Sequence, residues 1–135
     1  MPDVNSFLNP ASVVVVGVSR DKSKIGRLIF NQLLSPKRKV FGVNPHVEKL
    51  EKQKIYHRLT QIPKGVQLAI YAVPADLVTK SVKEAASLGI KNHLIVSSGF
   101  GESDEKGKLR EKELEGLIKK YQISIQGPNC LGNIS

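Results

Sequence analysis

The chain has 135 residues and a mass of 14.8 kDa, which is the size of a single domain. Hydrophobic residues make up 40% of it and charged residues 24%, a balance that excludes disordered and collagen-like chains. It has no apolar run long enough to cross a bilayer, and its single cysteine can form neither an internal disulfide nor a thiolate zinc cage. Because Asp3 is acidic and no long apolar stretch follows it, we expect no signal peptide. We therefore expect one soluble, cytoplasmic domain over residues 1–135, without contact to a membrane.

Positive charge is concentrated in one part of the chain. Lysine and arginine number 21 against 12 aspartates and glutamates, and residues 20–54 alone contribute a net charge of +7 from ten basic and three acidic residues. Such a segment attracts nucleic acid, anionic lipid or a phosphate-rich cofactor. From charge alone, a lysine-rich surface that keeps the chain soluble is the simpler interpretation. Nucleic acid is disfavoured, because the four Phe and three Tyr are not interleaved with the basic residues.

The first half of the chain begins with a continuous β-branched run. Residues 12–17 (SVVVVG) predict a strand that is covered on both faces. Apolar residues at helical spacing predict a helix from residue 25 that ends before Ser35-Pro36, and residues 39–43 predict a second strand. The polar stretch 46–66 is expected to be irregular, with one short helix at most.

The second half alternates strands and helices. The patterns predict strands at 67–73, 91–96 and 123–126, a helix at 76–88 that Gly89 caps, and a helix at about 104–121 with Leu114, Leu117, Ile118 and Tyr121 facing the core. Strands that alternate with amphipathic helices predict βαβ units. We therefore expect an α/β, Rossmann-like, doubly wound fold with a mainly parallel five-stranded sheet and helices on both faces.

Ligands of such sheets bind beyond the carboxyl ends of the strands. In this chain those ends carry Gly, Pro, Ser and Asn instead of acid–base groups. This composition favours a binding crevice built from backbone groups and small side chains, with no catalytic residue and no metal.

The loop after the first strand reads GVSRDKSKIG, from Gly17 to Gly26. It lacks the close G-x-G-x-x-G spacing of a dinucleotide site, and Asn44 stands where an NAD-binding strand would end in an acidic residue. The loop still suits a phosphate, because it precedes a helix N-terminus and carries hydroxyl and basic side chains. Those side chains belong to Ser19, Arg20, Lys22, Ser23 and Lys24. At Gly26 we expect a larger residue to weaken ligand binding, with only a modest loss of fold stability.

Five segments in succession carry a family resemblance: FLNPASVVVVGVSRDKSKIG, VNP, QLAIYAVPADLV, SSGFGE and GPNCLG. Over nearly the whole chain the sequence resembles the CoA-binding domain of NDP-forming acyl-CoA synthetases. This is the group of the ADP-forming acetyl-CoA synthetases, related to the α-subunit of succinyl-CoA synthetase. The resemblance implies a Rossmann-like domain that binds coenzyme A, or its acyl thioester, across the strand ends.

The phosphate loop and the resemblance together give a set of candidate CoA-binding residues. They are Gly17, Ser19, Arg20, Lys24, Ile25, Gly26, Val43, Asn44, Pro45, Val73, Pro74, Ala75, Ser97, Ser98, Gly99, Asn129 and Cys130. His46 departs from the family, which often has a lysine after the VNP turn; Lys49 or the 37–39 cluster could supply that charge. Cys130 has two interpretations, a partly buried loop residue or a thiol close to that of CoA.

In the family, acyl phosphate forms through a phosphorylated histidine in a later domain, and an ATP-grasp domain handles the nucleotide. His46, His57 and His93 match no such histidine motif; we expect His57 to be solvated and His93 to pack within a strand. The resemblance thus implies a domain excised from a larger synthetase, whose phosphohistidine and ATP-grasp domains or subunits are its partners, and which alone binds without turnover. Two alternatives stay open: a regulatory module of a synthetase-like protein lysine acetyltransferase, and an NAD-sensing Rossmann regulator.

Overall fold

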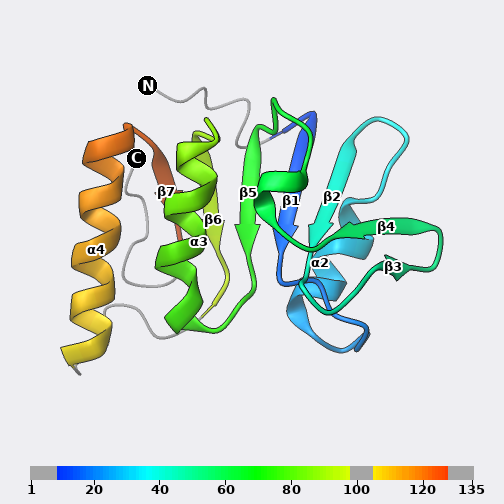
Figure 1. The fold of residues 1–135 in the computed structure, drawn as a ribbon, viewed down its shortest axis with the longest axis horizontal. Coiled ribbons are helices and arrows are strands. Elements are labelled where there is room, and N and C mark those ends of the chain that lie inside the picture. Colours follow the sequence, from blue (N-terminus) through cyan, green and yellow to red (C-terminus); the bar gives the residue numbers. More distant parts are fainter. Residues whose placement is uncertain (1–8, 98–104, 128–135) are drawn as a thin grey trace.

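The computed structural model describes residues 9–97 and 105–127 (Figure 1). Its helices and strands, in chain order, are β1 (Ser12–Val16), α2 (Ile25–Leu33), β2 (Lys39–Val43), β3 (Lys49–Leu50), β4 (Gln53–Tyr56), the 3-10 helix η1 (Leu59–Gln61), β5 (Leu68–Tyr71), α3 (Ala75–Ser87), β6 (Asn92–Ile95), α4 (Glu105–Tyr121) and β7 (Ser124–Gln126). None of the helices within these two ranges is both long and apolar enough to cross a membrane.

The strands form one sheet in the order β3-β4-β2-β1-β5-β6-β7. Every neighbouring pair is parallel except β3 and β4, which form an antiparallel hairpin. Numbered along the chain, the six parallel strands lie in the order 3-2-1-4-5-6, the doubly wound arrangement of Rossmann folds. The expected Rossmann-like α/β fold is confirmed.

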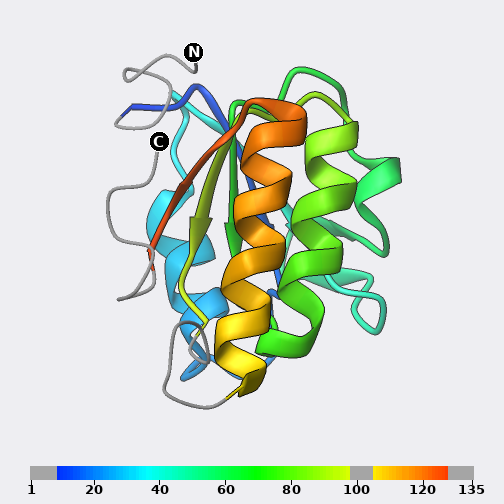
Figure 2. The same ribbon diagram turned by 90° about the vertical axis from the view of Figure 1, so that its left-hand side faces the viewer.

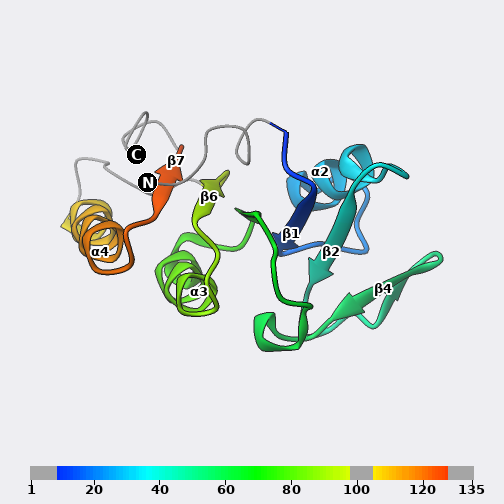
Figure 3. The ribbon, with the colours of Figure 1, turned by 90° about the horizontal axis from the view of Figure 1, so that it is seen from above.

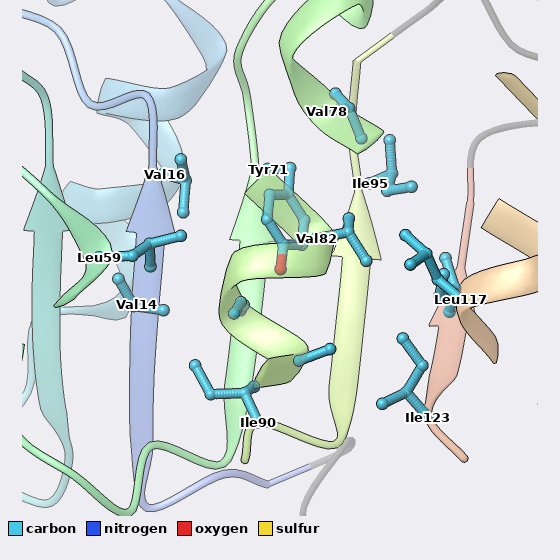
Figure 4. Packing of buried hydrophobic residues seen from close by; sticks show 14 of the residues in the cluster. Val14, Val16, Leu59, Tyr71, Val78, Val82, Ile90, Ile95, Leu117 and Ile123 are labelled. Carbon is cyan, nitrogen blue, oxygen red and sulfur yellow. The ribbon is translucent and has the colours of Figure 1, made fainter. Parts of the chain in front are cut away.

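Helices cover both faces of this sheet. Helix α2 lies on one face, and α3 and α4 lie side by side on the other (Figures 2 and 3). Successive residues of a strand point to opposite faces, so Val13 and Val15 pack in the core under α2, whereas Val14 and Val16 pack in the core under α3 and α4. Figure 4 shows the second of these cores. Burial on both faces explains why β1 is continuously apolar.

Within the residues that the structure describes, the sheet has seven strands and not the predicted five. The two additional strands, β3 and β4, are short and lie in the segment 46–66. Strand β4 adds to the edge of β2 through only two residue pairs, Gly42 with Ile55 and Val43 with Tyr56, and β3 folds back on β4. Of the four residues of β4, only Ile55 is buried. A strand with so little contact carries no continuous apolar run, which is why the segment reads as irregular in the sequence. The expected short helix of this segment is present as η1.

Candidate ligand-binding site

A cleft of about 1130 Å³ lies at the carboxyl ends of β1, β2 and β5. The arrows of these three strands point to the same edge of the sheet, the lower edge in Figure 1. Strand β1 pairs with β2 on one side and with β5 on the other, so the chain winds away from it in opposite directions. The cleft therefore occupies the topological switch point, where open α/β sheets bind their ligands.

Two glycines let the first loop and helix α2 lie close to β5. Gly17 has a φ of 102°, and a Cβ there would lie 2.8 Å from the carbonyl carbon and oxygen of Ala72. A Cβ at Gly26 would lie 2.4 Å from the carbonyl oxygen of Gly17 and 3.0 Å from the Cβ of Ala72. The N-terminus of α2 can approach the end of β1 only because both positions lack a side chain.

Two helix N-termini face the cleft without a side-chain cap. Lys24 precedes α2 and Pro74 precedes α3, both residues line the cleft, and neither forms a capping hydrogen bond with its side chain. The first N–H groups of a helix have no partner within the helix, and the helix dipole adds positive potential there. Asp76, in the first turn of α3, pairs with Arg110 of α4. The arrangement suits a ligand with more than one anionic or carbonyl group.

The loop after β1 is held by its own side chains. The hydroxyl of Ser19 accepts a hydrogen bond from the Asp21 N–H at 3.0 Å, and the carboxylate of Asp21 accepts from both the N–H and the hydroxyl of Ser23 at 2.9 and 2.7 Å. The hydrogen bond from the Ser23 hydroxyl is the main cause that lowers the pKa of Asp21. Arg20 points elsewhere: its guanidinium donates to the carbonyl of His46 at 3.4 Å, and it does not line the cleft.

Asn44 joins the two turns that border the cleft. Its side-chain N–H donates to the carbonyl of Val18 at 2.6 Å, and its side-chain oxygen accepts from the His46 N–H at 2.7 Å. Its backbone N–H donates to the carbonyl of Tyr56 on β4 at 2.9 Å. These bonds connect the ends of β1, β2 and β4 and fix one wall of the cleft.

The opposite wall comes from β5, β6 and α3. The hydroxyl of Ser97 donates to the carbonyl oxygen of Val73, and the Val96 N–H donates to the carbonyl of Tyr71 at 3.0 Å. These bonds hold the turn after β6 against the turn that enters α3. The two turns of this wall present small and apolar side chains to the cleft, among them Val73 and Ala75.

The structure brings most of the predicted residues together. Lining the cleft are Gly17, Ser19, Lys24, Ile25, Gly26, Val43, Asn44, Pro45, Val73, Pro74, Ala75 and Ser97. The predictions at Ser98, Gly99, Asn129 and Cys130 lie outside the described residues.

Sequence reasoning missed two groups of residues that line the cleft. His57 and Arg58 follow β4, and their N–H groups both donate to the side-chain oxygen of Gln61, at 3.1 and 3.3 Å. Lys80, Ser81 and Glu84 come from α3. Helical spacing after the VPA turn could have indicated the second group, because residues three and four apart share a helix face. No signal indicated the first, because β4 itself was not expected.

Positive groups outnumber negative ones around the cleft. Lys24, Arg58 and Lys80 line it together with His46 and His57, and Glu84 is the one acidic residue among its described lining residues. Within the two described ranges, no cluster of His, Cys, Asp and Glu could hold a metal ion. The described lining residues thus carry an excess of positive charge, which attracts anions.

His93 and Tyr71 form a buried pair on neighbouring strands, outside the cleft lining. The Tyr71 hydroxyl lies 2.7 Å from Nδ1 of His93, and Nε2 of His93 lies 2.8 Å from the carbonyl oxygen of Ile90. Because a carbonyl can only accept, Nε2 carries the proton and Nδ1 accepts from the tyrosine. Burial lowers the pKa of His93 to about 4 and raises that of Tyr71 well above its usual value. The expectation that His93 packs inside the fold, and that His57 is exposed, is confirmed.

Comparison with known proteins agrees with this geometry. The family described as "CoA binding domain" matches residues 11–135. Subunit alpha of the ADP-forming acetate–CoA ligase II of Pyrococcus furiosus is 39% identical over 127 residues, which cover 93% of this chain and 28% of the relative. The ADP-forming acetate–CoA ligase II of Archaeoglobus fulgidus is 40% identical over 137 residues, covering 98% of this chain and 20% of the relative.

A solved structure shows the same fold. The dinucleotide forming acetyl-coenzyme A synthetase 1 of Candidatus Korarchaeum cryptofilum, in complex with phosphate and ADP, superimposes with a TM-score of 0.86 at 34% sequence identity, over 96% of this chain and 28% of the other. The chain belongs to the family of CoA-binding domains, and its relatives are ADP-forming acetyl-CoA synthetases. It spans between a fifth and a third of the length of these relatives. Coenzyme A is thereby confirmed as the cofactor, and the acetyltransferase-linked and NAD-sensing alternatives find no support.

Proposed function

We propose that this chain is the CoA-binding part of an NDP-forming acyl-CoA synthetase and binds CoA or acyl-CoA in the cleft at the switch point. One observation carries the proposal: two helix N-termini without side-chain caps, those of α2 and α3, face a single cleft with an excess of positive charge. CoA carries a pyrophosphate and a ribose 3′-phosphate at one end and a neutral amide chain at the other. Both the anionic and the polar neutral parts of CoA therefore find complementary groups.

The two walls suit different parts of this ligand. The wall around the first loop supplies Lys24 and the N–H groups that begin α2, and the turn after β4 supplies Arg58. These groups suit the phosphates. Val73, Ala75 and Ser97 on the other wall suit the uncharged pantetheine chain. The proposal extends the contacts to Ser98, Gly99, Asn129 and Cys130, with the same two interpretations for the Cys130 thiol as above.

The chain would bind without completing the reaction. Among the residues that line the cleft, the histidines are His46 and His57, both exposed and on the turns after β2 and β4. His93 is buried and neutral at physiological pH, with both ring nitrogens engaged. In this proposal, phosphohistidine and ATP-grasp domains or subunits of the whole synthetase carry the phosphoryl transfer.

Calorimetric titration with CoA and with NAD tests the proposal. We expect CoA to bind and NAD to bind weakly or not at all. The side chain of Asn44 already forms hydrogen bonds with Val18 and His46, and it is not an acidic acceptor for ribose hydroxyls. Saturating CoA should also raise the melting temperature, since a ligand that binds only the native state stabilises it. Tighter binding of NAD than of CoA, or no binding of CoA, would refute the assignment.

A further inference from the structure

Arg27 is buried although it is charged. It is the third residue of α2, and only 4% of it is exposed. A buried charge is costly unless it is paired or fully hydrogen-bonded. No carboxylate within residues 9–97 and 105–127 forms an ion pair with Arg27; the ion pair found there joins Arg110 and Asp76. Its burial must therefore be supported by other groups.

Those groups are two consecutive carbonyls of the loop after β1. Nη1 of Arg27 donates to the carbonyl oxygens of Ser19 at 3.1 Å and Arg20 at 3.3 Å, and Nε donates to the side-chain oxygen of Asn31 at 3.1 Å. The C=O and N–H of a trans peptide point in opposite directions. By holding both carbonyls, Arg27 also sets the direction of the N–H groups of Arg20 and Asp21.

The guanidinium is one of the groups that hold the loop against the body of the domain, besides the bond of Asn44 to the carbonyl of Val18. Residues 20–24 are all exposed, so the side chains of this part of the loop do not anchor it by burial. Ser19, whose carbonyl Arg27 holds, lines the cleft, whereas Arg27 itself does not. Its positive charge meets carbonyl dipoles and no carboxylate, and burial reduces the screening of its field by water.

We propose that Arg27 is a positioning residue for the phosphate end of CoA. It acts by fixing the backbone of the loop that borders the cleft and by placing an un-neutralised charge behind that loop. This inference rests on the proposed function, and it assigns a role to a residue that does not itself line the cleft but bonds the backbone of one that does.

Titration of CoA against Arg27→Gln and Arg27→Lys tests the role. The variants are compared at a temperature where circular dichroism shows each of them folded. We expect Arg27→Gln to weaken CoA binding by about tenfold or more, as for lost hydrogen bonds to a charged group, and to flatten the salt dependence of the Kd. Arg27→Lys keeps the positive charge but loses the planar guanidinium that bonds several acceptors at once. Compared with Arg27→Gln, it should therefore show the wild-type salt dependence and part of the wild-type affinity. A purely structural role would lower the melting temperature of both variants without changing the salt dependence.

Arg38 offers a matched control at the opposite end of the sheet, because the 37–39 cluster, which the sequence offered as a source of charge for CoA, does not line the cleft. It is partly buried, precedes β2, and donates from Nε to the carbonyl of Pro10 at 3.1 Å. Arg38→Gln removes the same charge and a comparable hydrogen bond, and it should leave the Kd for CoA within about twofold of wild type.

A measurement on the wild-type chain covers the case in which both Arg27 variants fail to fold. In nitrogen-15 NMR, the Nε–H signal of Arg27 should shift on addition of CoA, and that of Arg38 should not. If the wild type does not bind CoA, the proposed function fails. If it does bind, the inference alone is refuted when Arg27→Gln retains wild-type affinity and salt dependence, or, with unfolded variants, when the Arg27 signal does not move.

Discussion

The carbonyl oxygen of Gly17 lies only 2.4 Å from the point that a Cβ on Gly26 would occupy. This contact is between the backbone at the end of β1 and that of α2, so no side-chain rotation can relieve it. The sequence-based expectation that a larger residue at 26 costs little fold stability is therefore wrong. The position of α2 against the sheet depends directly on this glycine.

We predict that Gly26→Ala lowers the free energy of unfolding by about 1–3 kcal/mol, as is typical of overpacking, and that Gly26→Val lowers it further. Urea denaturation measures this change. Gly116 in α4 is the control, because a Cβ there would meet nothing within 4 Å beyond the backbone of its own helix. Gly116→Ala should instead raise stability by about 0.5–1 kcal/mol through helix propensity. Equal effects at the two glycines would contradict the close packing of α2 on Gly17.

Lys24 should contribute to CoA affinity through the phosphates. It precedes α2 and lines the cleft, so Lys24→Ala is expected to weaken CoA binding by about tenfold at low salt, with a smaller loss at high salt. Lys119→Ala, in the last turn of α4, is the control and should leave the affinity unchanged. If the two variants bind CoA with the same affinity, the phosphates bind away from the first loop.

His93 should make stability depend on pH. Its pKa is lowered to about 4 in the folded chain, mainly by burial, while the unfolded chain takes up a proton near 6.5. Between these values the unfolded state binds more protons, so stability falls as the pH drops from 6.5 to 4, by on the order of 3 kcal/mol, and falls no further below 4 through this residue.

Urea denaturation between about pH 7.5 and 4 checks this dependence. His93→Gln removes the titrating ring, so the variant should be less stable than wild type at neutral pH but lose less stability on acidification. His57→Gln, at an exposed position, should show the wild-type dependence of the free energy of unfolding on pH. If the stability of His93→Gln fell with pH as steeply as that of the wild type, other groups would be the cause of the loss of stability in acid.

The isolated chain should not catalyse the formation of ATP. Incubation with acetyl-CoA, ADP and phosphate is expected to yield no ATP, because the cleft offers no histidine of the family's phosphorylated type and His93 is buried with both nitrogens engaged. A luciferase assay on highly purified protein measures the product. ATP formation that disappears in His46→Gln or His57→Gln would contradict the assignment of binding alone.

The buried strands were predictable from the sequence because burial on two faces leaves a continuous apolar run, as in β1 and β5. The edge of the sheet was not, because β4 forms only two residue pairs with β2, β3 pairs only with β4, and both strands carry exposed polar residues. Arg58 was missed as a cleft residue for the same reason.

In the candidate site, too, the sequence predicted the positions of residues better than their contacts. Residues directly after predicted strands, such as Asn44 and Pro74, lie in the cleft as expected. Which groups their side chains bond was not predictable: Asn44 bonds Val18, 26 residues away, and Arg27 bonds the loop before its own helix. Such bonds depend on the packing of α2 and β2 against β1, which no local pattern specifies.

The bonds of Asn44 also limit how this chain could evolve. A single change to aspartate would create the acidic residue that dinucleotide-binding domains use for ribose. A carboxylate accepts hydrogen bonds but cannot donate one to the carbonyl of Val18, which Asn44 now does at 2.6 Å. The first step towards NAD would therefore set two oxygens against each other and separate the turns that form the cleft. A change of ligand preference at this position would therefore also change the structure of the switch point.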